Sequence, residues 1–199
     1  MPKTILSTAL MPNIDYITAI QQADAVEIEF HETFRKQTYR NRYEIAGPNG
    51  RQSLTVPVDK GGKSNCPISD VRISYDENWP KQHWKSLETA YNSSPFFLYY
   101  RDDFESILFK KHEFLIDMNM EFTELILNIL EIDNKISYTK KFIKNYGDAI
   151  DMRYLISPKE PFLKKEYKPY YQVFAEKNGF MENLSAIDLI FNEGKMITF

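Results

Sequence analysis

The stretch TILSTALMPNIDYITAIQQADAVEIEF, from Thr4 to Phe30, decides the fold. Its first part, residues 4–10, is apolar and rich in β-forming residues, which predicts a strand. Isoleucines recur at every third position over residues 14–22 and predict a short helix, while residues 25–30 alternate apolar with acidic side chains and predict a second strand. A strand, a helix and a strand within about 30 residues make a βαβ unit, so we expect two parallel strands.

A β-hairpin is expected after this unit. Residues 42–46 and 52–58 have the pattern of two strands, and the sequence GPNG at 47–50 lies between them. Its Asn-Gly dipeptide favours a tight turn because both residues tolerate a positive φ. Residues 68–75 alternate again and predict one more strand.

From Trp79 onwards the apolar period changes to that of helices. Pro80 suits a first helical turn, and this helix is predicted to reach Tyr91. A second helix is predicted to begin near Pro95, and a third covers residues 113–131. The predicted apolar stripe of the second helix consists of Phe96, Tyr100, Phe104 and Ile107.

The last third of the chain is predicted to close the fold. Short strands are expected within residues 136–143, 151–157 and 170–176, and Ser185 is expected to cap a final helix over 186–191. The elements together predict an α/β fold: a mostly parallel, Rossmann-like sheet with an inserted β-hairpin and a helical layer from the middle third.

The length of 199 residues predicts a single domain, 1–199. Within it, residues 1–78 hold the βαβ unit and the hairpin, residues 79–132 the helical layer, and residues 133–199 the closing strands and the final helix.

Composition excludes several classes of function. The net charge of −3 argues against general nucleic-acid binding, which needs a basic face. The single Cys66 excludes an internal disulfide, and the three histidines have no metal-binding spacing, so we expect no metal site. No cofactor motif is present, and the cofactor stays unknown. No apolar run reaches the roughly 20 residues of a membrane span, so we expect a cytoplasmic protein without membrane insertion; the oligomeric state stays unknown.

A basic stretch stands out against this acidic background. If residues 36–42 are extended, Lys36, Arg40 and Arg42 share one face, and Tyr39 and Asn41 lie on the other. One interpretation is a site for a phosphate or carboxylate, which arginine can bind with two hydrogen bonds. The other is that the cations pair with acidic residues of the preceding strand and loop, namely Glu27, Glu29 and Glu32.

Further polar residues are candidates for chemistry. His83 is a candidate general base because histidine titrates near neutrality, and Asp70 or Glu88 would orient it. The alternative is a partly buried histidine flanked by tryptophans. Other candidate ligand-binding residues are Tyr91, Gln172, Ser185 and Asp188. Gln172 and Asp188 lie among apolar residues, where structural hydrogen bonding to loop backbone is the favoured interpretation.

In their order along the chain, several of these clusters resemble the WbqC-like protein family. The resemblance rests on ALMPNIDYITAIQQADAVEIE, KQTYRNRYEIAGPNGRQSLTVPV, ISDVRISYDENWPKQHWKSLETAYNSSPFF, and finally YYQVF with NLSAIDLIFNEG. The family's basic element corresponds to Lys36, Arg40, Asn41 and Arg42, its helix position to His83, and its late element to Ser185 and Asp188. In the first loop only Pro12 and Tyr16 correspond, which leaves ligand contacts from that loop open.

The resemblance implies a role in bacterial surface-polysaccharide biosynthesis. It points to an acyl or aminoacyl transferase acting on a nucleotide-linked or phosphorylated amino sugar. The expected partner is a small anionic ligand, a nucleotide-sugar or an acyl donor, bound by Arg40 and Arg42 and oriented by Tyr39 and Asn41. The alternative is a non-catalytic module that binds a nucleotide-sugar or a partner enzyme, so whether the chain is an enzyme stays open.

Overall fold

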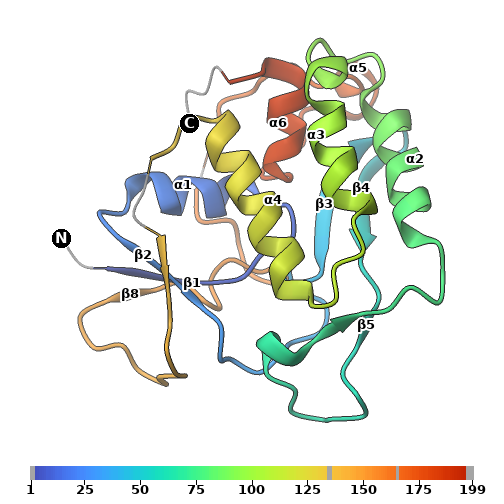
Figure 1. Cartoon of the computed structure of the whole chain (residues 1–199). Coiled ribbons are helices and arrows are strands. Elements are labelled where there is room, and N and C mark those ends of the chain that lie inside the picture. The colour runs from blue at the N-terminus through green and yellow to red at the C-terminus, as the bar shows by residue number, and fades with distance from the viewer. Residues whose placement is uncertain (1–2, 134–135, 165, 196–199) are drawn as a thin grey trace.

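A four-stranded parallel sheet forms one side of the molecule (Figure 1). The computed structural model describes residues 3–133, 136–164 and 166–195. The strand order is β7-β2-β1-β8. The strands are β1 (Thr4–Ser7), β2 (Val26–Glu29), β7 (Ile136–Tyr138) and β8 (Ile150–Asp151). The predicted α/β class with a mostly parallel sheet is confirmed.

The predicted βαβ unit is present. Helix α1 (Ile14–Gln22) connects β1 to β2, and the side chain of Asn13 caps it by accepting a hydrogen bond from the backbone N–H of Tyr16 at 3.1 Å. The first strand ends at Ser7, earlier than predicted, and Met11 with φ 43° redirects the chain before the helix. The backbone N–H of Leu10 instead donates to the carbonyl of Tyr39, which ties this loop to the basic stretch.

The inserted hairpin is also present. Strands β3 (Arg42–Gly47) and β4 (Gly50–Thr55) pair antiparallel through a two-residue loop, and Gly50 adopts φ 104°. The predicted strand over 68–75 is mostly wrong. Residues Ile68–Asp70 form the 3-10 turn η1, and only β6 (Arg72–Ile73) is extended, where it pairs with β5 (Val58–Asp59).

Helices cover the other side of the molecule, as Figure 1 shows. The three predicted helices are α2 (Trp79–Tyr91), α3 (Phe97–Phe109) and α4 (Leu115–Ile129). The stripe predicted for α3 is partly wrong: Phe97 is fully buried, whereas Phe96 is 38% exposed. Helix α3 begins two residues after Pro95, and this shifts the buried face of its first turn by one residue.

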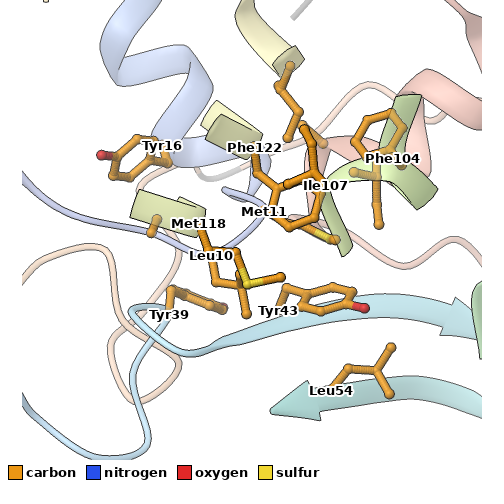
Figure 2. Close-up of a cluster of buried hydrophobic side chains, with 14 of the residues drawn as sticks. Leu10, Met11, Tyr16, Tyr39, Tyr43, Leu54, Phe104, Ile107, Met118 and Phe122 are labelled. Carbon is orange, nitrogen blue, oxygen red and sulfur yellow. The ribbon is translucent and has the colours of Figure 1, made fainter. Parts of the chain in front are cut away.

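One cluster of buried side chains joins the helices to the hairpin and to the loop after β1. Figure 2 labels members of this cluster from the loop after β1, the hairpin, α3 and α4, among them Leu10, Met11, Tyr43, Leu54, Phe104, Met118 and Phe122. Each buried side chain of this size contributes roughly 1.5–3 kcal/mol. The hairpin and the loop are therefore held in place by the same packing that orders the helical layer.

The last third differs most from expectation. The strand predicted over 151–157 ends at Asp151, and residues 170–176 are not a strand but lead into the short helix α5 (Ala175–Asn178). The final helix α6 (Ala186–Glu193) begins after Ser185, as predicted, but the side chain of Ser185 makes no capping hydrogen bond; Gly194 follows the last helical residue. Short runs without a long apolar periodicity carry too little information to separate strands from turns.

Candidate functional site

The carboxyl ends of the parallel strands bring polar residues together. Ser7 ends β1, Glu29 ends β2 and Asp151 ends β8. Strand β1 lies between β2 and β8, so the chain leaves β1 toward one neighbour and returns later on its other side. In open α/β sheets, such a reversal of strand order leaves a crevice at the carboxyl ends, where ligands bind.

Arg40 enters this crevice and is paired there. Its Nε donates to Oε1 of Glu32 at 2.9 Å, and its Nη2 donates to Oε2 of the same carboxylate at 2.6 Å. Nη2 also donates to the hydroxyl of Ser7 at 2.6 Å, and that hydroxyl donates to the carbonyl of Arg153 at 2.9 Å. Arg40 and Glu32 are both buried, so this two-point pair is shielded from solvent.

Arg153 forms the second half of this network. Its Nε and Nη2 donate to the two carboxylate oxygens of Asp151 at 2.9 and 2.6 Å, and Nη1 donates to Glu29 at 3.2 Å. The hydrogen bonds to Asp151 raise the pKa of Arg153, and those from Arg153 lower the pKa of Asp151. We call Ser7, Glu29, Glu32, Arg40, Asp151 and Arg153 the strand-end network.

The buried carboxylate of Glu29 has three hydrogen-bond donors in addition to Arg153. Its carboxylate accepts hydrogen bonds from the hydroxyls of Thr139 at 2.8 Å and Tyr146 at 2.9 Å, and from the backbone N–H of His31 at 2.8 Å. The segment between β7 and β8 is thereby attached to the end of β2. The lone pairs of this buried carboxylate are satisfied, which a charged group in such a place requires.

A basic cavity of about 230 Å³ lies beside the network. The buried Arg40 and Arg153 contribute to its wall, while Arg35, Lys36 and Lys159 line it with exposed side chains. Its full lining is Arg35, Lys36, Gln37, Thr38, Arg40, Arg153, Tyr154, Ser157, Lys159 and Glu160. Five cations thus border the cavity against one carboxylate. We call it the basic cavity.

The structure separates the two interpretations of the basic stretch. Arg40 pairs with Glu32, as the second interpretation expected, but Glu27 pairs with Lys3 and Glu29 with Arg153. The extended arrangement is wrong: residues 36–41 form no strand, and Gln37 adopts φ 59°. Lys36 therefore points to solvent while Arg40 is buried, and the cations do not share a strand face.

Three other residues of the stretch serve the fold locally. Tyr39 is buried, and burial raises its pKa to about 12. The amide of Asn41 donates to the carbonyl of Val56 at 2.9 Å, and Arg42 donates to the carbonyl of Gln37 at 3.2 Å. Asn41 and Arg42 do not line the basic cavity. Their predicted roles in ligand binding stay predictions.

The predicted catalytic group is not brought together. His83 is buried beside Trp79 and Tyr43. The hydroxyl of Tyr43 lies 3.3 Å from Nδ1 of His83, and burial lowers the pKa of His83 to about 4. Glu88 faces Arg101 at 3.6 Å, and Asp70 faces Lys63 at 3.4 Å. Within the described part of the chain, neither carboxylate is hydrogen-bonded to His83. The structure therefore does not support a role for Asp70 or Glu88 in orienting the His83 ring.

A second buried polar cluster surrounds Asp188. Its carboxylate accepts hydrogen bonds from the hydroxyls of Tyr91 at 2.7 Å and Tyr170 at 2.6 Å, and from the amide of Gln172 at 2.8 Å. Burial raises the pKa of Asp188 despite these donors. Ser185 stands apart from this carboxylate, since its hydroxyl donates to the carbonyl of Met11 at 2.7 Å. These hydrogen bonds join α2, α6 and residues 170–172, which is a structural role for the polar residues of the cluster.

Sequence reasoning missed Arg153, Asp151 and His31. Arg153 is a lone arginine in the apolar run DMRYLIS, and a charge in such a run is a signal for a buried pair. His31 is the exposed histidine of the three, and its Nε2 lies 3.0 Å from the carbonyl of Thr139. No local pattern distinguished His31, because its position depends on the pairing of β2 with β7.

Residues 3–133, 136–164 and 166–195 contain no group of three or more His, Cys, Asp or Glu side chains placed to hold a metal ion. None of the helices in this part of the chain has the length and apolar character to cross a membrane.

Comparison with known proteins places these features in context. The profile of the WbqC-like protein family matches residues 8–156, which include most of the strand-end network. The chain is 24% identical over 218 aligned positions to the uncharacterized protein Rv1507c of Mycobacterium tuberculosis (strain ATCC 25618 / H37Rv). That alignment covers 96% of this chain and 93% of the relative. No solved structure matches the chain significantly.

Proposed function

The chain belongs to the WbqC-like protein family, and from this premise we propose that its basic cavity binds the phosphate of a nucleotide-linked or phosphorylated amino sugar. The proposed activity is transfer of an acyl or aminoacyl group to the sugar amine. The family resemblance implies the substrate class, and the positive charge of the cavity lining supports a phosphorylated ligand.

One observation carries the proposal: the cavity holds cations that no carboxylate neutralises. Arg40 and Arg153 are balanced by Glu29, Glu32 and Asp151. In contrast, Arg35, Lys36 and Lys159 form no ion pair within the described part of the chain, and Glu160 is the one carboxylate of the lining. Cations crowded around a cavity repel each other, and a bound phosphate relieves that repulsion.

Arg35 lies against an aromatic ring of the cavity. The guanidinium of Arg35 lies 4.1 Å from the ring centroid of Tyr154, and both residues line the cavity. This pairing holds Arg35 in one orientation, which lowers the entropic cost of placing its donors on an anion. The buried network beneath keeps Arg40 and Arg153 fixed, so the wall of the site is preorganised.

Transfer requires a base, and we assign that role to His31 instead of His83. His31 is exposed just after β2, and its backbone N–H donates to Glu29, which pairs with Arg153 of the cavity wall. Because Nε2 of His31 faces a carbonyl oxygen, it carries the proton, and Nδ1 keeps its lone pair. The sugar amine would attack the carbonyl carbon of an activated acyl donor, a thioester or acyl phosphate. The C–N bond forms, the bond to the leaving thiolate or phosphate breaks, and Nδ1 takes the amine proton.

A specific observation favours a second candidate, a binding module without turnover. The cavity lining contains neither histidine nor cysteine, and its two buried arginines are fully paired. Such a site can retain a nucleotide-sugar by charge alone. The two functions share the ligand and differ in whether the acceptor is consumed.

The experiment is ligand titration by calorimetry with inorganic phosphate, a UDP-linked amino sugar and the same amino sugar without phosphate. Lys36→Ala/Lys159→Ala should weaken binding of both anions by roughly tenfold or more, the equivalent of about 1.4 kcal/mol. Lys81→Ala/Lys111→Ala, a matched pair of exposed lysines outside the cavity lining, should leave it unchanged. Equal affinities of all three proteins for the anions, or equal binding of the amino sugar without phosphate, would contradict the phosphate site.

Turnover then separates the two candidates. With an amino-sugar acceptor and a thioester donor, His31→Gln should abolish transfer while leaving the affinity for the nucleotide-sugar intact. His83→Gln should retain transfer in protein that remains folded. A wild-type protein that binds the sugar and consumes no acceptor with thioester or acyl-phosphate donors supports the binding module.

A further inference from the structure

The loop between β7 and β8 carries an exposed basic and apolar segment. Residues 140–144, with the sequence KKFIK, are all exposed. Phe142 and Ile143 are 45% and 36% exposed, and three lysines flank them. These lysines form no ion pair within the described residues. In a chain with a net charge of −3, this segment concentrates positive charge around two unburied apolar side chains.

The segment is held in a defined shape by Arg153. Its Nη1 donates to the carbonyl of Ile143 at 3.0 Å, and its Nη2 lies 3.3 Å from the carbonyl of Lys144. The guanidinium also lies 5.2 Å from the ring centroid of Phe142. Because Arg153 is itself fixed by Glu29 and Asp151, the loop backbone is anchored to the sheet. The exposed side chains therefore belong to a built surface.

Two further exposed apolar side chains lie on the segment that follows Arg153. The ring of Tyr154 lies 5.5 Å from the same guanidinium of Arg153 and is 37% exposed. Leu155 follows it with 49% exposure. The guanidinium of Arg35 also contacts the ring of Tyr154. A cation of the basic cavity therefore borders these side chains as well. We call residues 140–144 with Tyr154 and Leu155 the loop surface.

We propose that the loop surface docks on a membrane that contains anionic lipids. Phe142 and Ile143 would enter the boundary between headgroups and acyl chains, and the three lysines would reach the lipid phosphates. A bilayer accepts both kinds of side chain at once, since its acyl chains take Phe142 and Ile143 while its headgroup phosphates take the lysines. RNA offers base stacking to Phe142 alone, and a purely acidic protein segment offers no apolar contact. Docking here is at the surface and involves no spanning helix.

The inference is independent of the proposed function. Lipid binding through the loop needs no occupant in the basic cavity, and cavity binding needs no membrane. The two meet at Arg153, which lines the cavity and holds the loop. A docked protein would present its basic cavity near the bilayer surface, where phosphorylated or lipid-linked sugars are within reach.

The test is sedimentation with vesicles of phosphatidylcholine alone and of phosphatidylcholine mixed with phosphatidylglycerol. The wild-type chain should sediment with the anionic vesicles at low salt, remain in solution with the neutral ones, and dissociate as salt rises. Phe142→Ser/Ile143→Ser and Lys140→Gln/Lys141→Gln/Lys144→Gln should each lower the partition coefficient by roughly fivefold or more. Because the three lysine side chains are exposed, the lysine variant should keep the thermal midpoint of the wild type. The Phe142/Ile143 variant loses a contact with Arg153, so circular dichroism at the assay temperature should verify that it is folded.

A matched control comes from helix α3. Leu98 and Tyr99 are adjacent exposed apolar residues, at 69% and 77%, without flanking lysines. Leu98→Ser/Tyr99→Ser should leave vesicle binding unchanged. The proposal is overturned if wild type does not prefer anionic vesicles, if the loop variants bind as well as wild type, or if polyuridylate or polyglutamate binds the loop surface more tightly than the vesicles do. Affinity of the loop variants for the soluble UDP-linked sugar should persist, so failure here and failure of the cavity proposal are distinguishable.

Discussion

Arg40 and Glu32, eight residues apart on one irregular loop, form a buried ion pair with two hydrogen bonds at 2.9 and 2.6 Å. Their side chains are only 4% and 1% exposed. The pair lies beneath the basic cavity and joins the loop to Ser7 at the end of β1. Arg40 therefore shapes the site, and Glu32 neutralises its charge in the absence of a ligand.

Replacing Arg40 should destabilise the fold. Arg40→Met leaves the Glu32 carboxylate buried without its partner, and breaking such a pair costs about 3–5 kcal/mol. The double variant Arg40→Met/Glu32→Met should recover much of this loss because no charge remains buried. Arg35→Met is the surface control and should change stability by less than about 0.5 kcal/mol. Urea denaturation of the four proteins measures each difference. A single variant as stable as wild type would show that the pair is not closed in solution.

His83 should make the fold sensitive to acid. Burial holds its pKa at about 4, below the ordinary 6.5, so the folded chain keeps the ring neutral while the unfolded chain takes up a proton below pH 6.5. The stabilisation is complete above pH 6.5 and is lost as the pH falls toward 4, with a full size of about 3 kcal/mol. His83→Gln removes this dependence. Denaturation curves of both proteins across this range should diverge; parallel curves would place the imidazole in solvent.

Asp188 should make the fold less stable as the pH rises, the opposite of the pH dependence caused by His83. Burial raises its pKa above 3.8, so the folded chain retains a proton that the unfolded chain releases. A raised folded pKa gives stabilisation that is complete below the unfolded pKa and is lost as pH rises through the folded pKa. The stability of wild type relative to Asp188→Asn should therefore decrease with rising pH above 3.8. A stability difference that stays constant over this range would mean that the hydrogen bonds from Tyr91 and Tyr170 keep the carboxylate ionised.

Gly194 should not tolerate a side chain. It ends α6 with φ +70°, and an added Cβ would lie 3.0 to 3.2 Å from three ring atoms of Phe96. Gly194→Ala should destabilise the chain by roughly 1–2 kcal/mol from the backbone conformation, with crowding against Phe96 adding to it. Gly147→Ala is the matched control, since Gly147 has φ +61° and open space around its Cβ position. Thermal unfolding should rank wild type first, Gly147→Ala second and Gly194→Ala third.

The candidate site could be predicted only in part. The basic stretch and its possible acidic partners were visible, and the pairing of Arg40 with Glu32 was among the alternatives. The partner of Glu29 was not visible, because Arg153 lies 124 residues away along the chain. His83 was singled out by its residue type, yet its surroundings decide its chemistry: aromatic rings on α2 and β3 exclude the water that would support its charge.

The amino-acid sequence by itself determined the local elements: the βαβ unit, the hairpin and the three helices. Their apolar periods of two and 3.6 residues arise within each segment and need no distant partner. The tertiary structure alone decided which charges are neutralised and which remain available to a ligand. That outcome depends on burial and on contacts between segments far apart in the chain, since a buried charge is stable only beside the partner that folding brings to it.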